Sequence, residues 1–442
     1  METLWKIVFY ILNFAVYLFL IWWVVNKYLV ATMAAASLGY WIFFFVLIFL
    51  AVSSVGYWAA HYLWNNGYWG MFFKNVGMFF LALFVLYIKV TVPISFSDFR
   101  KNGTEFEWSA GISGSKYYTV ENVRTDLICS DKGSVSVLAR FPSVSKEWGT
   151  SGSLEISSGK RSLPTQLYTK WISCAEGESG QLYEGTFELP YDTILDLFRK
   201  GYVYKEPNGT VSHWEYSGIV VGLAPGGVVA LWVDGSHRRV QVGCWVAGKL
   251  PADNEIFASW GGQKERVKQL LERKSNYIPD YIKNQTIPEK QWGEYCKRYS
   301  WRYKIEFEGS DVKIIDIETE YYNGELYHLY PLDDSLYHER ACPKQIYIGW
   351  AHDGNRYKAY IQFDKKYMFS HINKLNEIPN SKMDFIFNIN TNNNMIDCYL
   401  SNQIDTIEFP DKYRKIKLFM NAKEVYSNYS GEGRKFEDCN YD

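Results

Sequence analysis

The fold is decided by a stretch that occurs twice in the chain, as PTQLYTKW at residues 164–171 and as PKQIYIGW at residues 343–350. Pro, Gln, Tyr and Trp match in register, and Leu is replaced by Ile. Both stretches alternate in the manner of half-buried strands, so we expect Trp171 and Trp350 to pack in a core. The order of the elements that follow also repeats, and we interpret this as a diverged tandem duplication.

Each copy continues with strands and one helix. In the first copy we predict strands at 167–174 and 182–189, a helix at 191–200, and strands at 217–223, 228–233 and 238–246. In the second copy we predict a strand at 357–363, a helix at 367–375, and strands at 385–389, 395–400 and 404–409. Residues 224–227, APGG, suit a tight turn, because Pro presets φ and Gly accepts a positive φ. A phosphate-binding loop would need a helix after it, whereas a β-branched strand follows here, so we predict a hairpin.

The first 92 residues have a different composition. They carry only five formal charges, Glu2, Lys6, Lys27, Lys74 and Lys89. A bilayer core is crossed by about 20 apolar residues of helix. Runs at 5–25 and 33–55 meet this length, and a third run at 75–88 is short. The predicted fold class is therefore an α-helical membrane anchor of about three transmembrane helices, followed by two tandem β-rich domains. Each domain is expected to be α+β, a sandwich-like antiparallel sheet plus one helix. The predicted boundaries are 1–92 for the anchor, 93–251 for the first domain, 252–299 for a helical connector and 300–442 for the second domain.

Composition excludes some classes of protein. The chain has 47 Lys and Arg against 48 Asp and Glu, a formal net charge of -1, which is not the basic footprint of a nucleic-acid binder. With 48% hydrophobic and 18% aromatic residues, disorder as the overall state is excluded as well. The seven cysteines all follow residue 128, and their odd number leaves at least one unpaired. Cys174 and Cys244 fall in predicted strands, where buried thiols and a disulfide are equally compatible with the pattern.

The residues that carry enzyme chemistry do not gather into a motif. No two His lie four residues apart, as a helical zinc site requires, and no two Cys form a C-x-x-C pair. The stretch GTSGS at 149–153 lacks the final Gly of a nucleophile elbow. Glu318 and Glu320 are typical of a solvated β-surface and would serve a glycosidase only across a cleft. We therefore predict no catalytic, cofactor-binding or metal site, and a protein that is not an enzyme.

A resemblance to a known family becomes specific between residues 164 and 249. Its motifs are LYxxW at 167–171, YEGxF at 183–187, FRKGY at 198–202 and above all GLAPGGVVALW at 222–232. In these the chain resembles the bacterial family called domain of unknown function 2931, over about 110–250 and more weakly over 300–425. Many members of that family look like periplasmic lipoproteins of Gram-negative bacteria, so the resemblance implies a periplasmic region and brings no established catalytic residues. The chain has no Cys before Cys129 and hence no lipobox. We expect instead a multi-pass location in the bacterial inner membrane, with the C-terminal domains in the periplasm.

Five residues are predicted to make interactions: Trp214, His237, Arg238, Arg239 and Trp260. The two Trp lie in loop-like contexts beside charge, and aromatic residues with Arg or His neighbours are typical interface anchors. Our first hypothesis is a membrane-anchored, periplasmic, non-enzymatic binding protein that acts as an immunity-type inhibitor of a secreted antibacterial toxin. The alternatives are an envelope carbohydrate-binding or carbohydrate-cleaving protein and a structural subunit of a membrane complex. The expected partner is thus a protein, or a glycan in the first alternative, with no nucleic acid and no cofactor.

Overall fold

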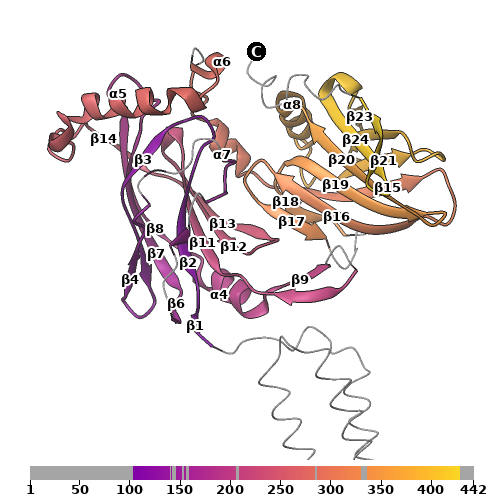
Figure 1. Ribbon diagram of the computed structural model, residues 1–442, viewed down its shortest axis with the longest axis horizontal. Helices are drawn as coiled ribbons and strands as arrows, with labels where there is room; N and C mark the ends of the chain where they lie inside the picture. The colour runs from indigo at the N-terminus through magenta and orange to yellow at the C-terminus, as the bar shows by residue number, and fades with distance from the viewer. Residues whose placement is uncertain are drawn as a thin grey trace, which may run out of the picture. The chain divides into compact units, whose positions relative to one another are not determined.

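The computed structural model describes residues 103–428, apart from 140, 142–145, 152–153, 156–158, 206–208, 284–285 and 330–335. All described elements belong to one compact unit, residues 96–442 (Figure 1). We call residues 103–250 the first half and residues 299–428 the second half. Both halves are built mainly of β-strands, as the alternating sequence predicts.

Two sheets make up the first half. One has the strand order β14-β8-β7-β3-β4, and the other contains β13-β12-β11-β2-β5. Neighbouring strands are antiparallel except β2 and β11, which run parallel. Their apolar faces enclose a core that includes Leu167, Trp171 and Val221. The strands are β2 (Ser109–Gly114), β3 (Val120–Cys129), β4 (Ser134–Ser136), β5 (Leu154–Glu155), β7 (Pro164–Ser173), β8 (Gln181–Glu188), β11 (Gly218–Leu223), β12 (Val228–Asp234), β13 (Arg239–Val246) and β14 (Gly248–Leu250).

Short elements complete the first half. Strand β1 (Glu105–Phe106) pairs with β6 (Arg161–Ser162), and β9 (Tyr202–Lys205) pairs with β10 (Val211–Trp214). Helix α4 (Tyr191–Lys200) has the predicted bounds and buries Ile194 and Phe198. It ends because Gly201 adopts φ 58°, a conformation that favours glycine.

The second half shows the same pairing pattern. Its sheets have the orders β18-β15-β21-β22-β23 and β25-β24-β20-β19-β16-β17, and β15 and β21 are its parallel pair. Helix α8 (Lys365–Leu375) follows β20 as α4 follows β8. Trp171 and Trp350 are both fully buried, which confirms their predicted place in the core. The strands are β15 (Tyr299–Phe307), β16 (Lys313–Tyr321), β17 (Leu326–Leu329), β18 (His338–Arg340), β19 (Pro343–His352), β20 (Asn355–Phe363), β21 (Met383–Ile389), β22 (Ile396–Ser401), β23 (Thr406–Glu408), β24 (Arg414–Met420) and β25 (Lys423–Ser427).

The two halves are joined through one sheet edge, where β17 pairs with β13 to give a continuous sheet of 11 strands. This junction explains why the sequences of β11 and β12 are apolar at almost every position. Val221 and Leu231 face the core of the first half, whereas Val220 and Trp232 belong to the core cluster that includes the second half. Strands that are buried on both faces need apolar side chains at every position.

The turn between β11 and β12 confirms the predicted hairpin, because the two strands pair antiparallel. Gly226 and Gly227 have φ angles of 77° and 75°. A Cβ at Gly226 would lie 2.5 Å from the carbonyl oxygen of Glu289, so both the conformation and the space require glycine.

The segment between the halves contains α5 (Gln263–Lys274), α6 (Asp280–Lys283) and α7 (Gln291–Tyr295). Val267 and Leu270 of α5 pack with Ile172 and Leu182 in a third core cluster. Directly after α7, Cys296 forms a disulfide with Cys244 of β13. Cys174 is a buried free thiol, and burial raises its pKa.

The predicted fold class needs a correction. Among the residues that the structure describes, no helix is both long enough and apolar enough to cross a membrane. The longest described helix, α5, has 12 residues and is strongly charged, whereas a span needs about 20 apolar residues. The finding contradicts a helical anchor as part of the fold class, and with it the predicted multi-pass location in the inner membrane with periplasmic C-terminal domains. Residues 1–92, on which the anchor was predicted, lie outside the described residues.

Candidate functional site

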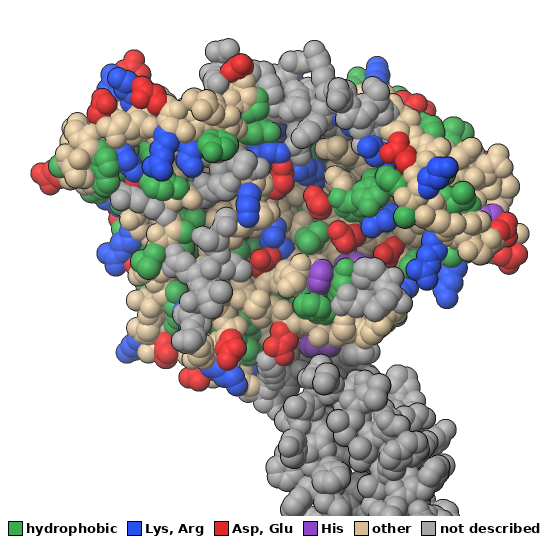
Figure 2. Space-filling view, in the orientation of Figure 1, with side chains coloured by type: hydrophobic (Ala, Val, Ile, Leu, Met, Phe, Trp, Pro, Cys, Tyr) green, Lys and Arg blue, Asp and Glu red, His purple; other side chains and the backbone are tan. Residues whose placement is uncertain are grey.

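A cavity of about 270 Å³ lies where the two halves meet, and we call it the junction cavity. Arg239 at the start of β13 lines it from the first half, and Glu320 of β16 and Lys344 of β19 line it from the second. Several aromatic rings complete the wall, among them Tyr321 and Trp292. Figure 2 shows basic and acidic side chains interspersed on the face that it draws, so charge recognition here depends on individual groups rather than on a broad field of one sign.

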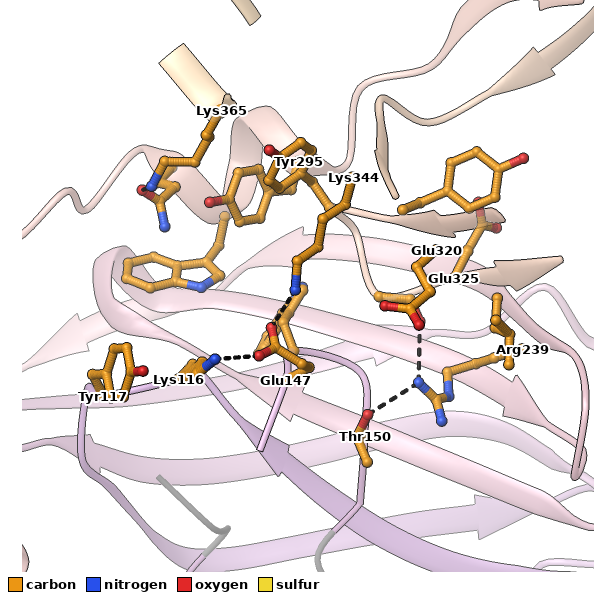
Figure 3. A pocket seen from close by; sticks show the side chains of 17 residues that line it. Lys116, Tyr117, Glu147, Thr150, Arg239, Tyr295, Glu320, Glu325, Lys344 and Lys365 are labelled. Carbon is orange, nitrogen blue, oxygen red and sulfur yellow. Dashed lines mark hydrogen bonds and ion pairs between the residues drawn. The ribbon is translucent and has the colours of Figure 1, made fainter. Parts of the chain in front are cut away.

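One carboxylate in this cavity holds two ammonium groups. Lys116 and Lys344 approach Glu147 from different directions, as Figure 3 shows, and each binds a different oxygen of its carboxylate. The Lys344 ammonium lies 2.7 Å from Glu147 Oε2. The Glu147 side chain is 42% exposed and that of Lys344 only 12%. The ion pair therefore fixes Lys344 against the loop that carries Glu147.

Glu320 is the carboxylate of the cavity that lacks such a partner. Burial raises its pKa, and attraction from Lys344 opposes this shift without cancelling it. The Tyr347 hydroxyl donates a hydrogen bond of 3.3 Å to Glu320 Oε1. Within the described part of the chain, no ion pair joins Glu320 to a cationic side chain, and the Lys344 ammonium forms an ion pair with Glu147. The site thus contains a partly desolvated carboxylate with unused capacity to bind a cation.

Two further charged groups of the cavity, Arg239 and Glu325, are paired within the protein. Arg239 donates to Asp234 at 2.8 Å, to the Thr150 hydroxyl at 3.3 Å and to the Gly324 carbonyl oxygen at 3.2 Å. Glu325 accepts from Arg298 at 2.6 Å and from the backbone N–H of Gln241 at 2.9 Å. These bonds hold both side chains in place, and the Lys365 ammonium donates a hydrogen bond of 2.8 Å to Gln291 Oε1. Glu320 is then the carboxylate of the cavity whose negative charge a ligand would balance.

Two of the five predicted interaction residues, Trp214 and His237, come together at the β9–β10 hairpin, and Arg238 lies next to His237 in the sequence. His237 stacks on Tyr204 with ring centroids 3.9 Å apart, and the edge of Trp214 meets His237 at 4.8 Å. The Arg238 guanidinium lies 4.2 Å above the Tyr327 ring, which belongs to the second half. These contacts are intramolecular: Trp214 and His237 pack with Tyr204 of the hairpin, and Arg238 contacts the second half.

The other two predicted residues lie elsewhere. Arg239 lines the junction cavity, and Trp260 packs against the guanidinium of Arg266 at 4.4 Å. The assignment of all five as partner contacts stays a prediction. Sequence reasoning missed Lys116, Glu147 and Lys344, and it treated Glu320 as an ordinary surface carboxylate. The sequence offered only a weak signal for these residues. Lys344 occurs in the repeated stretch, but its counterpart in the first copy is a threonine, so the repeat did not mark this position as a charged one.

A buried tyrosine behind the cavity wall gives a pH prediction. Tyr118 packs edge-on against Trp292, and its hydroxyl has no hydrogen-bond partner among the described residues. Burial raises its pKa from 10.0 to about 12. In the unfolded chain Tyr118 ionises at a lower pH than in the folded protein. The free energy of unfolding therefore falls as pH rises from about 10 towards 12. We expect Tyr118→Phe to be neutral or stabilising at pH 7 and to reduce this alkaline loss.

Denaturant unfolding of the wild type and the Tyr118→Phe variant between pH 7 and 11.5 measures this effect. The exposed Tyr277 supplies the matched control, Tyr277→Phe, which should leave the alkaline loss unchanged. An alkaline loss of equal size in the wild type and in Tyr118→Phe would contradict the prediction.

The fold and this site together define a β-sandwich protein with an internally charge-paired cavity at the junction of two similar halves. Residues 96–289 match a family model described as protein of unknown function (DUF2931), which confirms the resemblance for that part of the chain. The match does not extend to the second half. Neither a curated protein nor a solved structure shows significant similarity to the chain.

Proposed function

We propose that the protein is a non-enzymatic binding protein that receives a cationic side chain of a partner protein in the junction cavity. The observation that carries this proposal is the Glu320 carboxylate, which is partly desolvated and which, in the described chain, no ion pair joins to a cationic side chain. An Arg or Lys of a partner would supply the missing charge and form a charge-assisted hydrogen bond.

The surroundings of Glu320 favour such an anchor. The rings of Tyr321 and Tyr322 line the same cavity and are almost fully buried. Aromatic rings attract cations over their faces, and Arg in a desolvated pocket is a common hot spot of protein interfaces. Since Lys116 and Lys344 are bound to Glu147, they repel an incoming cation less than free ammonium groups would.

The partner class that we propose is the one expected from the sequence, a secreted antibacterial toxin, with this protein as its immunity-type inhibitor. An inhibitor of this kind acts by occupying a surface and needs no catalytic group of its own. The family match supports a relationship to proteins of unknown function and gives no information about the partner.

The test compares two carboxamide variants of the full chain. Proteins secreted by the source organism are captured on the immobilised wild type and identified by mass spectrometry, and the affinity of each is then measured. We expect Glu320→Gln to lower the affinity for the authentic partner at least tenfold, which corresponds to about 1.4 kcal/mol of binding free energy. Glu318→Gln is the matched control, because Glu318 lies on the same face of β16 but does not line the cavity. A partner that binds wild type and Glu320→Gln equally well would contradict the proposal.

We also propose that the two halves are diverged tandem copies, with domains at 93–251 and 300–442 and a connector at 252–299. The support is the shared strand pairing, with one parallel pair in each half, β2 with β11 and β15 with β21. The helices α4 and α8 follow equivalent strands. On this proposal, the junction cavity is lined by residues of both copies and of the connector.

A further inference from the structure

Three side chains connect the two sheets of the second half at one end. Trp350 and His352 lie on the same face of β19, and Asn393 belongs to the turn between β21 and β22. The Trp350 indole N–H donates a hydrogen bond of 2.8 Å to Asn393 Oδ1. The Asn393 amide nitrogen lies 2.7 Å from His352 Nδ1 and donates to the Thr391 carbonyl oxygen at 3.2 Å. Trp350 is fully buried, and Asn393 is only 4% exposed.

The chemistry of these partners determines the protonation state of His352. An indole N–H can only donate and a carbonyl oxygen can only accept, so Trp350 and Thr391 together fix the orientation of the Asn393 amide. The second N–H of this amide then points to His352, whose Nδ1 must accept it. The ring proton is therefore on Nε2, and His352 is neutral in this arrangement.

Carboxylates on two turns lie near the ring of His352. Asp353 Oδ2 is 3.6 Å from His352 Nε2, on a side chain that is 83% exposed. On the β15–β16 turn, a Cβ at Gly309 would lie 3.4 Å from His352 Cε1, and the same turn carries Glu308 and Asp311. These negative charges attract a second proton to the ring when the pH falls.

Basic side chains at this end of β19 lie on the other face of the sheet. Lys313 of β16 and Arg356 of β20 both pair with Ala351, so they extend away from His352. They therefore do little to oppose the uptake of a proton by the His352 ring.

The second proton conflicts with the hydrogen-bond network. It binds to His352 Nδ1, because Nε2 already carries a proton, and it then faces the Asn393 N–H, so that two donors meet. Rotating the Asn393 amide would leave the buried Trp350 N–H without its acceptor, which is costly.

We propose that Trp350, Asn393 and His352 form an acid-sensitive latch, in which protonation of His352 breaks its contact with Asn393 and releases the β21–β22 turn from β19. The closed latch binds one proton fewer than the open one, so its population falls as the pH falls. None of the three residues lines the junction cavity, so this inference is independent of the proposed binding function.

The experiment measures amide hydrogen exchange of residues 390–395 in the full-length protein at about pH 7.5 and about pH 5, corrected for the intrinsic pH dependence of exchange. We expect the corrected rate of this turn to be at least tenfold higher at the acidic pH. His352→Gln keeps an acceptor for the Asn393 N–H but takes up no proton, so its turn should exchange equally at both pH values. The matched control is His338→Gln, which should keep the full response because His338 is exposed on β18.

A second variant tests the conflict between the two donors. Asn393→Asp supplies two acceptor oxygens, one for the Trp350 N–H and one for protonated His352, so acid should no longer speed up exchange of the turn. A thermal unfolding curve shows that each variant is folded. Any one of three results would overturn the inference: equal corrected exchange of the turn at both pH values in the wild type, an acid response that persists in His352→Gln, or a response of full size in Asn393→Asp.

Discussion

Replacing Arg266 by methionine is expected to lower the free energy of unfolding by about 3–5 kcal/mol. The Nε and Nη2 groups of Arg266 each donate a hydrogen bond of 3.0 Å to a different oxygen of Glu121. Glu121 is fully buried and Arg266 is 8% exposed. Methionine removes the cation and deprives the buried carboxylate of the Arg266 charge, which is far more costly than losing an exposed ion pair.

The neighbouring rings add to this effect. The guanidinium lies 4.4 Å from the centre of the Trp260 ring and 5.4 Å from that of Phe141, so methionine also loses the cation–π contacts. Arg266 attaches α5 to β3, and the substitution should weaken the packing of the whole helix against the first half.

Denaturant unfolding of the full chain measures the change. Arg273→Met supplies the matched control, because Arg273 is exposed on the same helix, and it should cost less than about 0.5 kcal/mol. A double variant, Glu121→Leu with Arg266→Met, removes both charges and should recover much of the lost stability. If Arg266→Met were no less stable than Arg273→Met, the ion pair would not contribute as the geometry indicates.

Trp260 shows where inference from the sequence ends. Its position beside charged residues in a loop predicts an interface anchor, which stays a prediction. The structure adds a contact with the guanidinium of Arg266 that the local sequence did not indicate. Local signals were sufficient for α4 and for the β11–β12 hairpin, because amphipathic spacing, Gly201 and the Pro-Gly-Gly turn act over a few residues. The partner of a buried cation depends on how distant elements dock, which no local pattern encodes.

The junction cavity illustrates the same limit more strongly. Lys116, Glu147 and Lys344 come from three separate parts of the chain, and Glu147 and Lys344 are 197 residues apart. Lys344 belongs to the second half, whose sheet joins that of the first half through a single pair of residues, Arg239 of β13 and Leu326 of β17. The repeated strands could be predicted because each carries its own periodicity. The apolar outer faces of β11 and β12 determine how one half docks on the other. The sequence does not show which elements pack against these faces.

The Cys244–Cys296 disulfide connects this junction to the segment between the halves, and removing it is expected to destabilise the protein by about 4 kcal/mol. The bond closes a loop with a sequence separation of 52 residues, which restricts the unfolded chain. Near it in the sequence, Gln241 of β13 accepts a hydrogen bond from Arg298 at 3.2 Å through its carbonyl oxygen. Loss of the disulfide should therefore loosen the chain beside the wall of the junction cavity.

The double variant Cys244→Ser with Cys296→Ser tests this expectation by denaturant unfolding. The wild type in a reducing agent should fall to the stability of the double variant, and the double variant should not respond to the reducing agent. Cys129, Cys174, Cys342 and Cys398 are buried free thiols, so among the described cysteines the reducing agent acts only on this bond. Equal unfolding free energies for the oxidised wild type and the double variant would contradict the prediction. A loss of stability in the double variant that the reducing agent does not reproduce would instead show that packing of the serines, and not the missing bond, causes the change.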